Sequence, residues 1–359
     1  MKMRWTVVVP IAAILVLALT WGRSAGGLLV ALVALALVGA VIAAVHHAEV
    51  VAHRVGEPFG TLILAVAVTV IEVGLIVMLM SAKGEGSESL ARDTVFSAFM
   101  IVCNGVMGLC LLVGALKHRV LEFRVDGVTA ALATLSAVAT LALVLPNFTV
   151  TTPGPTYSTA QLAFAGIASL ILYGVFVFMQ TVRHRDYFLP VQQDGEGDPG
   201  EEHAEPPTAR TALVSLGLLL VCLVSVVGLA KTASPAIEAS IAAIGAPRTT
   251  VGVAIALLVL LPETAAAVRA AARNRVQTSF NLALGSALAS IGLTIPSIAV
   301  VSLISGDRLA LGLGPLQMVL LALTVVITTL TVAPGRATLM QGTVHLVLFG
   351  AFLFLAVSP

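Results

Sequence analysis

Two glutamates, Glu72 and Glu263, each stand alone inside a long apolar run of the sequence. An ionised carboxylate near the centre of a lipid bilayer costs a few kcal/mol, so such a residue indicates a functional site. The two runs occupy matching places in the two halves of the chain. A symmetric pair of membrane acids predicts an ion pathway in which proton and cation compete for the same carboxylate oxygens.

The composition places these acids in a polytopic membrane protein. Of 359 residues, 58% are hydrophobic and only 10% are charged, whereas about a quarter of the residues of a soluble domain carry charge. The formal net charge of +1 argues against a nucleic-acid partner, which requires a basic surface. Cys103, Cys110 and Cys222 lie in apolar segments, so we interpret them as small hydrophobic residues and not as disulfide partners.

Apolar stretches of about 17 to 25 residues can cross the bilayer as helices, and the sequence divides into such stretches almost end to end. We therefore predict an all-α fold with 11 transmembrane helices. Their approximate bounds are Trp5–Trp21, Gly26–Val45, Phe59–Ala82, Thr94–Leu116, Gly127–Pro146, Thr159–Val182, Thr211–Ala230, Thr250–Val268, Val276–Leu303, Leu311–Ala333 and Met340–Val357.

The first stretch, residues 1–25, has two interpretations. Lys2 and Arg4 precede a short apolar run, as in a secretory signal peptide. Trp5 and Trp21 bracket the run as an interfacial aromatic pair does, which favours a retained N-terminal transmembrane helix.

Loop charges predict the orientation of the chain. With the N-terminus in the cytoplasm, 13 of the 19 Lys and Arg residues fall on the cytoplasmic side and 6 on the other. Because cytoplasmic loops are rich in these residues, we expect a bacterial inner-membrane protein with a cytoplasmic N-terminus.

The other ten spans divide into two five-helix repeats, residues 26–185 and 210–359, around a linker at 186–209. The linker contains six acidic residues between Asp194 and Glu205 and is predicted to be a solvated cytoplasmic segment. After the first span of each repeat comes a Glu followed seven positions later by Gly and then x-Pro, at Glu49 to Pro58 and at Glu238 to Pro247. The charge pattern places these copies on opposite faces, so the repeats are predicted to be inverted, as in many secondary transporters.

The helix after each glutamate carries polar side chains that provide a second wall of the predicted site. Ser279, Ser286, Ser290 and Thr294 recur at spacings of seven, four and four, and Ser97 and Asn104 repeat the first of these spacings in the other half. Hydroxyl groups often bond across membrane helices for structural reasons. Asn104 is the member of this set that we most expect to bind the cation.

These residues resemble the cation/calcium exchangers, and within them the bacterial calcium/proton antiporters. The resemblance covers both halves and is strongest at residues 56–72, 261–269 and 281–286. The repeats of that family centre on Gly-Asn-Ala-x-Glu, whose glutamate binds the cation and exchanges it for protons. The glutamates correspond to Glu72 and Glu263, whereas the family's asparagine corresponds to Thr69 in one repeat and Leu260 in the other.

The resemblance implies a secondary active antiporter that exports Ca²⁺ in exchange for H⁺ by alternating access and has no cofactor. The predicted cation ligands are Glu72, Glu263, Asn104, Ser286, Thr69 and Ser290. Since the motif asparagines are absent, exchange of Na⁺ or K⁺ for protons on the same scaffold stays open. An intramembrane enzyme is a distant alternative, because the sequence contains no His-Glu-x-x-His metal motif. The oligomeric state is undetermined.

Overall fold

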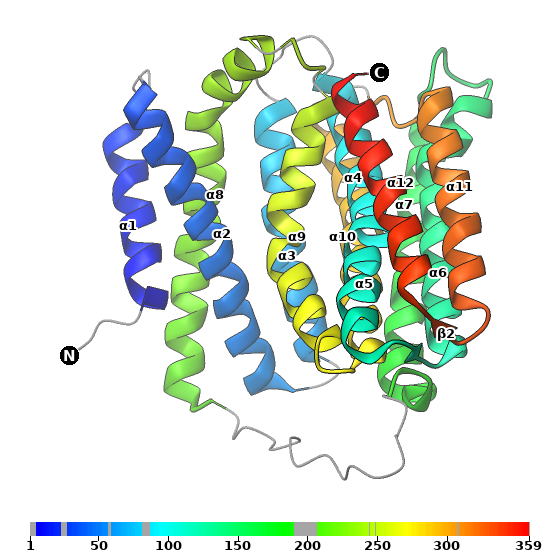
Figure 1. Ribbon diagram of the computed structural model, residues 1–359. Coiled ribbons are helices and arrows are strands. Elements are labelled where there is room, and N and C mark those ends of the chain that lie inside the picture. The colour runs from blue at the N-terminus through cyan, green and yellow to red at the C-terminus, as the bar shows by residue number, and fades with distance from the viewer. Residues whose placement is uncertain are drawn as a thin grey trace. The chain divides into compact units, whose positions relative to one another are not determined.

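The computed structural model describes residues 5–22, 27–56, 59–80, 87–189, 207–243, 245–247, 249–306 and 309–358. Helices and two short strands follow one another along the chain (Figure 1). The α-helices are α1 (Trp5–Thr20), α2 (Gly27–Val55), α3 (Phe59–Met80), α4 (Leu90–Met100), α5 (Met107–His118), α6 (Val125–Ala139), α7 (Thr159–Phe178), α8 (Ala209–Ala243), α9 (Thr249–Ala271), α10 (Val276–Ser305), α11 (Pro315–Val332) and α12 (Leu339–Val357). The strands are β1 (Leu121–Glu122) and β2 (Arg336–Ala337).

Tighter or wider helical turns extend several of these helices. They are 3₁₀ turns at Ser87–Ser89, Leu145–Phe148 and Arg185–Phe188, and π-helical turns at Ile101–Val106, Thr140–Val144 and Met179–Arg183. The turn at Ile101–Val106 joins α4 and α5 into one segment, Leu90–His118, which is long enough to cross a membrane.

The described residues contain 10 helical segments that are long and apolar enough to cross a membrane. The additional helix α1 is apolar but has 16 residues. Together they match the 11 predicted spans and confirm the all-α polytopic class. Residues 190–206 of the linker predicted at 186–209 lie outside the described residues, as do Glu57 and Pro58 of the first repeat motif. At the ends of the predicted linker, residues 186–188 belong to a 3₁₀ turn and Ala209 begins α8.

Two helices extend well beyond their predicted ends. The sequence predicts that they end near Val45 and Ala230, whereas α2 continues to Val55 and α8 continues to Ala243. Each is followed by a glycine in the left-handed region, with φ of +78° at Gly56 and +64° at Gly245. A glycine just past a helix end adopts this conformation without steric cost. The repeat motif is thus the end of a long helix in both halves.

One compact unit, here unit 1, contains α1, α2, α3 up to Leu79 and α8 up to Ser240. The ring of Trp5, at the start of α1, lies 5.6 Å from that of His46 near the end of α2. Nζ of Lys231, in the second half of α8, lies 5.5 Å from the ring centroid of Trp21. Helix α1 is therefore packed into this unit, antiparallel to α2 and parallel to α8.

The other compact unit, unit 2, contains α4 to α7 and α9 to α12. At one end, β1 pairs with β2 in antiparallel register, Leu121 with Ala337. At the other end, Thr156 forms an isolated bridge with Ala310, whose N–H donates to the carbonyl of Glu88. The β1–β2 pair joins loops that the charge count assigns to the cytoplasmic side. The contacts of Ala310 join loops that it assigns to the opposite side. The predicted grouping of these loops is confirmed.

Candidate functional site

In unit 2, the segment α4–α5 and helix α9 lie side by side and run in the same direction. A Cβ atom on Gly252 would lie 2.8 Å from the backbone carbon of Asp93, and one on Gly114 would lie 3.4 Å from the carbonyl oxygen of Ala271. Asn104 follows Asp93 by eleven residues, and Glu263 follows Gly252 by the same number. The two side chains therefore lie at similar heights, about 16 Å along their helices from the Asp93–Gly252 contact.

Glu263 lies in the C-terminal half of α9 and is half-buried, with its Oε2 atom shielded from solvent. The preceding residue, Pro262, lies inside the helix and has no N–H to donate to the turn before it. The carbonyl oxygen one turn earlier in the helix therefore lacks the hydrogen bond that a backbone N–H at position 262 would donate.

Helix α10 follows α9 after a short connection at residues 272–275, so the two helices form an antiparallel pair. Ser286 is thirteen residues from Arg273 and Glu263 is ten, which places them at similar heights. Ser290, one turn further along α10, is 2% exposed. The structure therefore brings Asn104, Glu263, Ser286 and Ser290 to neighbouring helices of unit 2.

The carboxamide of Asn104 contacts helices that the sequence did not connect with it. Its Nδ2 donates to Oγ1 of Thr324 on α11 over 2.8 Å, and its Oδ1 lies 3.2 Å from Nδ1 of His345 on α12. Asn104 and His345 are fully buried and Thr324 is 1% exposed. The sequence analysis missed Thr324, and the one available signal for His345 was its isolation in an apolar run.

Asn104 lies inside a π-helical turn. Eleven residues make about three turns of a regular α-helix, and the side chains of Asp93 and Asn104 both contact α11, at Gln317 and Thr324. A π-helical turn contains more residues, and it therefore rotates the positions inside and after it. Asn104 lies inside the turn and contacts α11 and α12. Single π-helical turns of this kind occur frequently at functional sites.

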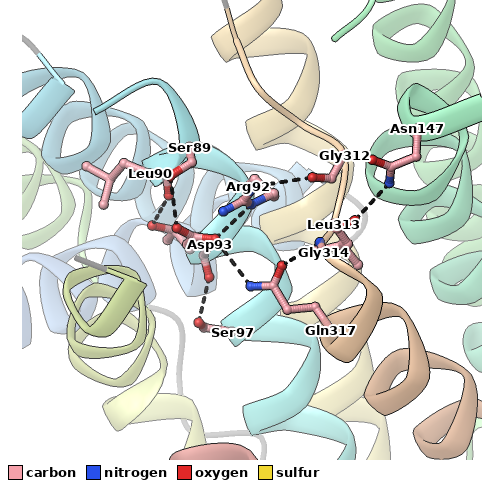
Figure 2. Close-up of polar contacts among 11 residues, drawn as sticks. Ser89, Leu90, Arg92, Asp93, Ser97, Asn147, Gly312, Leu313, Gly314 and Gln317 are labelled. Atoms are coloured by element: carbon pink, nitrogen blue, oxygen red, sulfur yellow. Dashed lines mark hydrogen bonds and ion pairs between the residues drawn. The ribbon is translucent and has the colours of Figure 1, made fainter. Parts of the chain in front are cut away.

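A buried acid fixes the start of α4 (Figure 2). Asp93 is 3% exposed, and its Oδ1 accepts a hydrogen bond from Nε of Arg92 over 2.8 Å. Its Oδ2 accepts from Oγ of Ser89 over 3.1 Å, and Nε2 of Gln317 on α11 lies 3.5 Å from Oδ1. The charge of this carboxylate is therefore balanced within its own surroundings, which marks Asp93 as a structural acid.

The same cluster holds the connection between α10 and α11. Nη1 of Arg92 donates to the carbonyl of Gly312 over 3.2 Å, and Nδ2 of Asn147 donates to the carbonyl of Leu313 over 2.9 Å (Figure 2). The cluster joins four parts of unit 2: α4, the 3₁₀ turn at Leu145–Phe148, the loop before α11 and α11 itself. The cluster was not predicted because these parts are far apart in sequence.

Unit 1 contains the two remaining predicted site residues, both on α3. Glu72 is 1% exposed, with its Oε1 atom shielded from solvent. Thr69 is 6% exposed and its hydroxyl donates to the carbonyl of Ala65 over 2.8 Å. A hydroxyl that donates to its own helix keeps lone pairs on its oxygen, so Thr69 retains the capacity to bind a cation.

The described residues contain no group of three or more His, Cys, Asp or Glu that could hold a metal ion. A cation at this level of the membrane would therefore depend on individual carboxylates together with hydroxyl, amide and backbone oxygens. Oxygen ligands of this mixed kind suit hard cations such as Ca²⁺ and Na⁺, whereas a tightly held zinc or copper ion would require nitrogen or sulfur ligands.

Comparison with known proteins shows relatives over almost the whole chain. ChaA of Escherichia coli, named as a sodium-potassium/proton antiporter, is 35% identical over 97% of this chain and 94% of its own length. The protein y4hA of Sinorhizobium fredii, whose name as an ionic transporter is provisional, is 49% identical over 90% of this chain and 87% of its own. A Ca²⁺/H⁺ antiporter of Aphanothece halophytica is 24% identical over 87% of this chain and 86% of its own.

Solved structures share the fold. The structure of native YfkE matches with a TM-score of 0.73 at 16% identity and covers 99% of both chains. The crystal structure of the H⁺/Ca²⁺ exchanger CAX matches with a TM-score of 0.72 at 16% identity, over 97% of this chain and 86% of the other. The family model described as "Sodium/calcium exchanger protein" matches residues 23–182 and 214–358. The chain thus belongs to the sodium/calcium exchanger protein family, as a multi-pass membrane antiporter and not an enzyme.

Proposed function

We propose that this antiporter exchanges Ca²⁺ from the cytoplasm for protons by alternating access, and that Glu72 and Glu263 are the carboxylates that bind either ion. The observation that carries the proposal is the position of each acid, alone in an apolar membrane helix with a carboxylate oxygen shielded from solvent. Because a carboxylate at that depth is costly, its presence indicates a function.

The chemistry of exchange follows from the two acids. Ionised together they supply a charge of minus two, which matches one calcium ion, and oxygen atoms, which calcium prefers. A carboxylate must lose its proton to bind the cation, so cation and proton exclude each other. If the empty, doubly charged site does not cross the membrane, transport is obligatory exchange. Thr69, Ser286, Ser290 and Asn104 are the proposed additional oxygen ligands.

A second candidate is exchange of Na⁺ or K⁺ for protons on the same scaffold. Two observations favour it: the motif asparagines of the calcium/proton antiporters are replaced by Thr69 and Leu260, and the Escherichia coli relative is named as a sodium-potassium/proton antiporter. Fewer amide oxygens suit a cation with fewer ligands or lower charge.

Ion specificity is tested in liposomes that contain the purified protein and an imposed pH gradient. We expect external Ca²⁺, supplied alone, to dissipate the gradient at micromolar concentrations, and Na⁺ and K⁺ to do so weakly and without competing with Ca²⁺. Dissipation by Na⁺ or K⁺ with no response to Ca²⁺ would establish the second candidate. No response to any of the three would refute cation/proton exchange.

We also propose that the N-terminus is cytoplasmic, in a bacterial inner membrane. The basic residues support this orientation: in unit 2 nine described Lys and Arg residues lie in or near the loops at the β1–β2 end, and Arg92 lies at the opposite end. The nine are Lys117, Arg119, Arg124, Arg183, Arg185, Arg269, Arg273, Arg275 and Arg336.

Thiol labelling of whole cells tests the orientation. The three native cysteines are buried, so the wild-type background is expected to be low. Val150 is 98% exposed in the loop before α7, and Val120 is 48% exposed beside β1. A membrane-impermeant maleimide is expected to label Val150→Cys in intact cells and Val120→Cys only after lysis. The reverse pattern would invert the orientation.

A further inference from the structure

A chain of buried hydrogen bonds links the π-helical turn to α11 and α12. Asn104 contacts Thr324 through its nitrogen and His345 through its oxygen, and Nε2 of His345 lies 3.1 Å from Oγ1 of Thr331. A neutral imidazole has one donor and one acceptor nitrogen. With the amide oxygen of Asn104 toward His345, Nδ1 of His345 donates to that oxygen, and Nε2 accepts from the hydroxyl of Thr331.

The orientation of the Asn104 carboxamide and the tautomer of His345 are coupled: with Nδ1 as the donor, the amide oxygen faces His345 and the NH₂ group faces Thr324. Rotation of the amide by half a turn would place its NH₂ group against Nδ1 of His345, and it would therefore require the other tautomer, in which Nδ1 accepts and Nε2 donates to Thr331. The amide oxygen keeps a second lone pair after accepting from His345. Buried polar groups that have complete partners are rigid, and partial loss of the partners is costly.

Close helix packing keeps His345 in place. A Cβ on Gly108 of α5 would lie 2.9 Å from Cβ of His345, and one on Gly342 of α12 would lie 2.7 Å from the backbone nitrogen of Leu112. Small residues of this kind allow membrane helices to approach closely. At this separation the imidazole has no room to leave the α5–α12 interface, so the hydrogen bond to Asn104 is maintained by packing.

We propose that Thr324 and His345 are positioning residues of the cation site, which hold the carboxamide of Asn104 in one orientation at the height of Glu263. The inference rests on the proposed function, in which Asn104 is a cation ligand. Helices α11 and α12 carry no predicted ligand, and through these two side chains they determine how strongly the site binds its cation.

The test measures transport rate against cation concentration for the full-length protein in liposomes, with Ca²⁺, Na⁺ and K⁺ each supplied alone. Thr324→Val removes the hydroxyl and keeps the shape of the side chain. We expect it to raise the KM for the transported cation about threefold to tenfold, the effect of one lost hydrogen bond, and to leave the maximal rate within about twofold. Thr324→Ser restores the hydroxyl and is expected to restore the KM.

Thr328→Val is the matched control. The Thr328 hydroxyl is also buried on α11 but donates to the backbone carbonyl of Thr324 over 2.7 Å, and the variant is expected to keep the native KM. A second pair avoids reliance on one variant: His345→Asn keeps a donor near the position of Nδ1, and His345→Leu does not. We expect a raised KM in His345→Leu and a KM close to native in His345→Asn.

The outcomes separate this inference from the proposed function. A native KM in both Thr324→Val and His345→Leu, with Glu263→Gln inactive, would overturn the positioning role alone. An equal rise in KM in Thr328→Val would overturn it as well, because the effect would then reflect general packing of α11. Wild-type transport by Glu263→Gln would instead refute the proposed function.

Discussion

Replacement of either membrane glutamate by glutamine is expected to reduce cation/proton exchange at least about 100-fold, because loss of one partner of a buried charged interaction costs several kcal/mol. Glutamine has nearly the same size as glutamate, but its carboxamide does not ionise and cannot take up and release a proton as the carboxylate does. Glu263→Gln and Glu72→Gln therefore remove the step on which obligatory exchange depends. The measurement is cation-driven dissipation of a pH gradient in liposomes, with equal amounts of each folded variant.

Glu122→Gln is the matched control for this experiment. Glu122 lies in β1 and is exposed, so the same chemical change occurs outside the membrane. We expect wild-type exchange in this variant. Full cation-dependent exchange by Glu72→Gln or Glu263→Gln would contradict the assignment of that glutamate. Loss of exchange in all three variants would point to a general requirement for folding or charge.

Substitution of Gly252 by alanine is expected to destabilise unit 2 and to reduce exchange about tenfold or more, since small displacements of a site have large effects on rate. The added Cβ would lie 2.8 Å from the carbonyl carbon of Asp93 and equally close to the backbone nitrogen of Thr94. Backbone atoms cannot rotate away, and the contacts of Asp93 with Arg92, Ser89 and Gln317 resist a shift of α4. The helices α4 and α9 must then separate.

Overpacking of this kind typically costs about 1–3 kcal/mol, of which the better helix propensity of alanine recovers up to about 1 kcal/mol. Thermal unfolding in detergent and exchange in liposomes measure the two effects. The control is Gly350→Ala on α12, where an added Cβ meets nothing within 4 Å. Gly350→Ala is expected to be neutral or slightly stabilising. Equal stability and activity in the two variants would contradict the close approach of α4 and α9.

Sequence periodicity and hydropathy were sufficient to predict the positions of the membrane helices, because these depend on local properties of the chain. The length and apolarity of each span follow from the thickness of the bilayer, so the helices could be located without knowledge of their neighbours. The error concerned the ends of α2 and α8. The segments after Val45 and Ala230 contain His47, Glu49 and Lys231, polar residues that lower hydropathy but do not end a helix. The glycines Gly56 and Gly245 end the helices, because they adopt positive φ.

The membrane acids and the grouping of the loops were also determined by the sequence itself. A lone glutamate in an apolar run can be recognised from the sequence alone, because its position in the run gives its depth in the bilayer and its burial cost depends on that depth. Predicted ligands on the helices after the glutamates followed from helical spacing. The spacing placed Asn104 with the serines of α10 but not with its actual partners.

The partners of Asn104 and Asp93 were decided only by the tertiary structure. Thr324 and His345 are 220 and 241 positions away from Asn104 in the chain, and Gln317 is 224 positions away from Asp93. The sequence determined what must lie in the membrane, since that depends on transfer of each segment from water to lipid. Which buried polar groups meet depends on helix packing and rotation, and these arise from contacts between segments that are far apart in the chain.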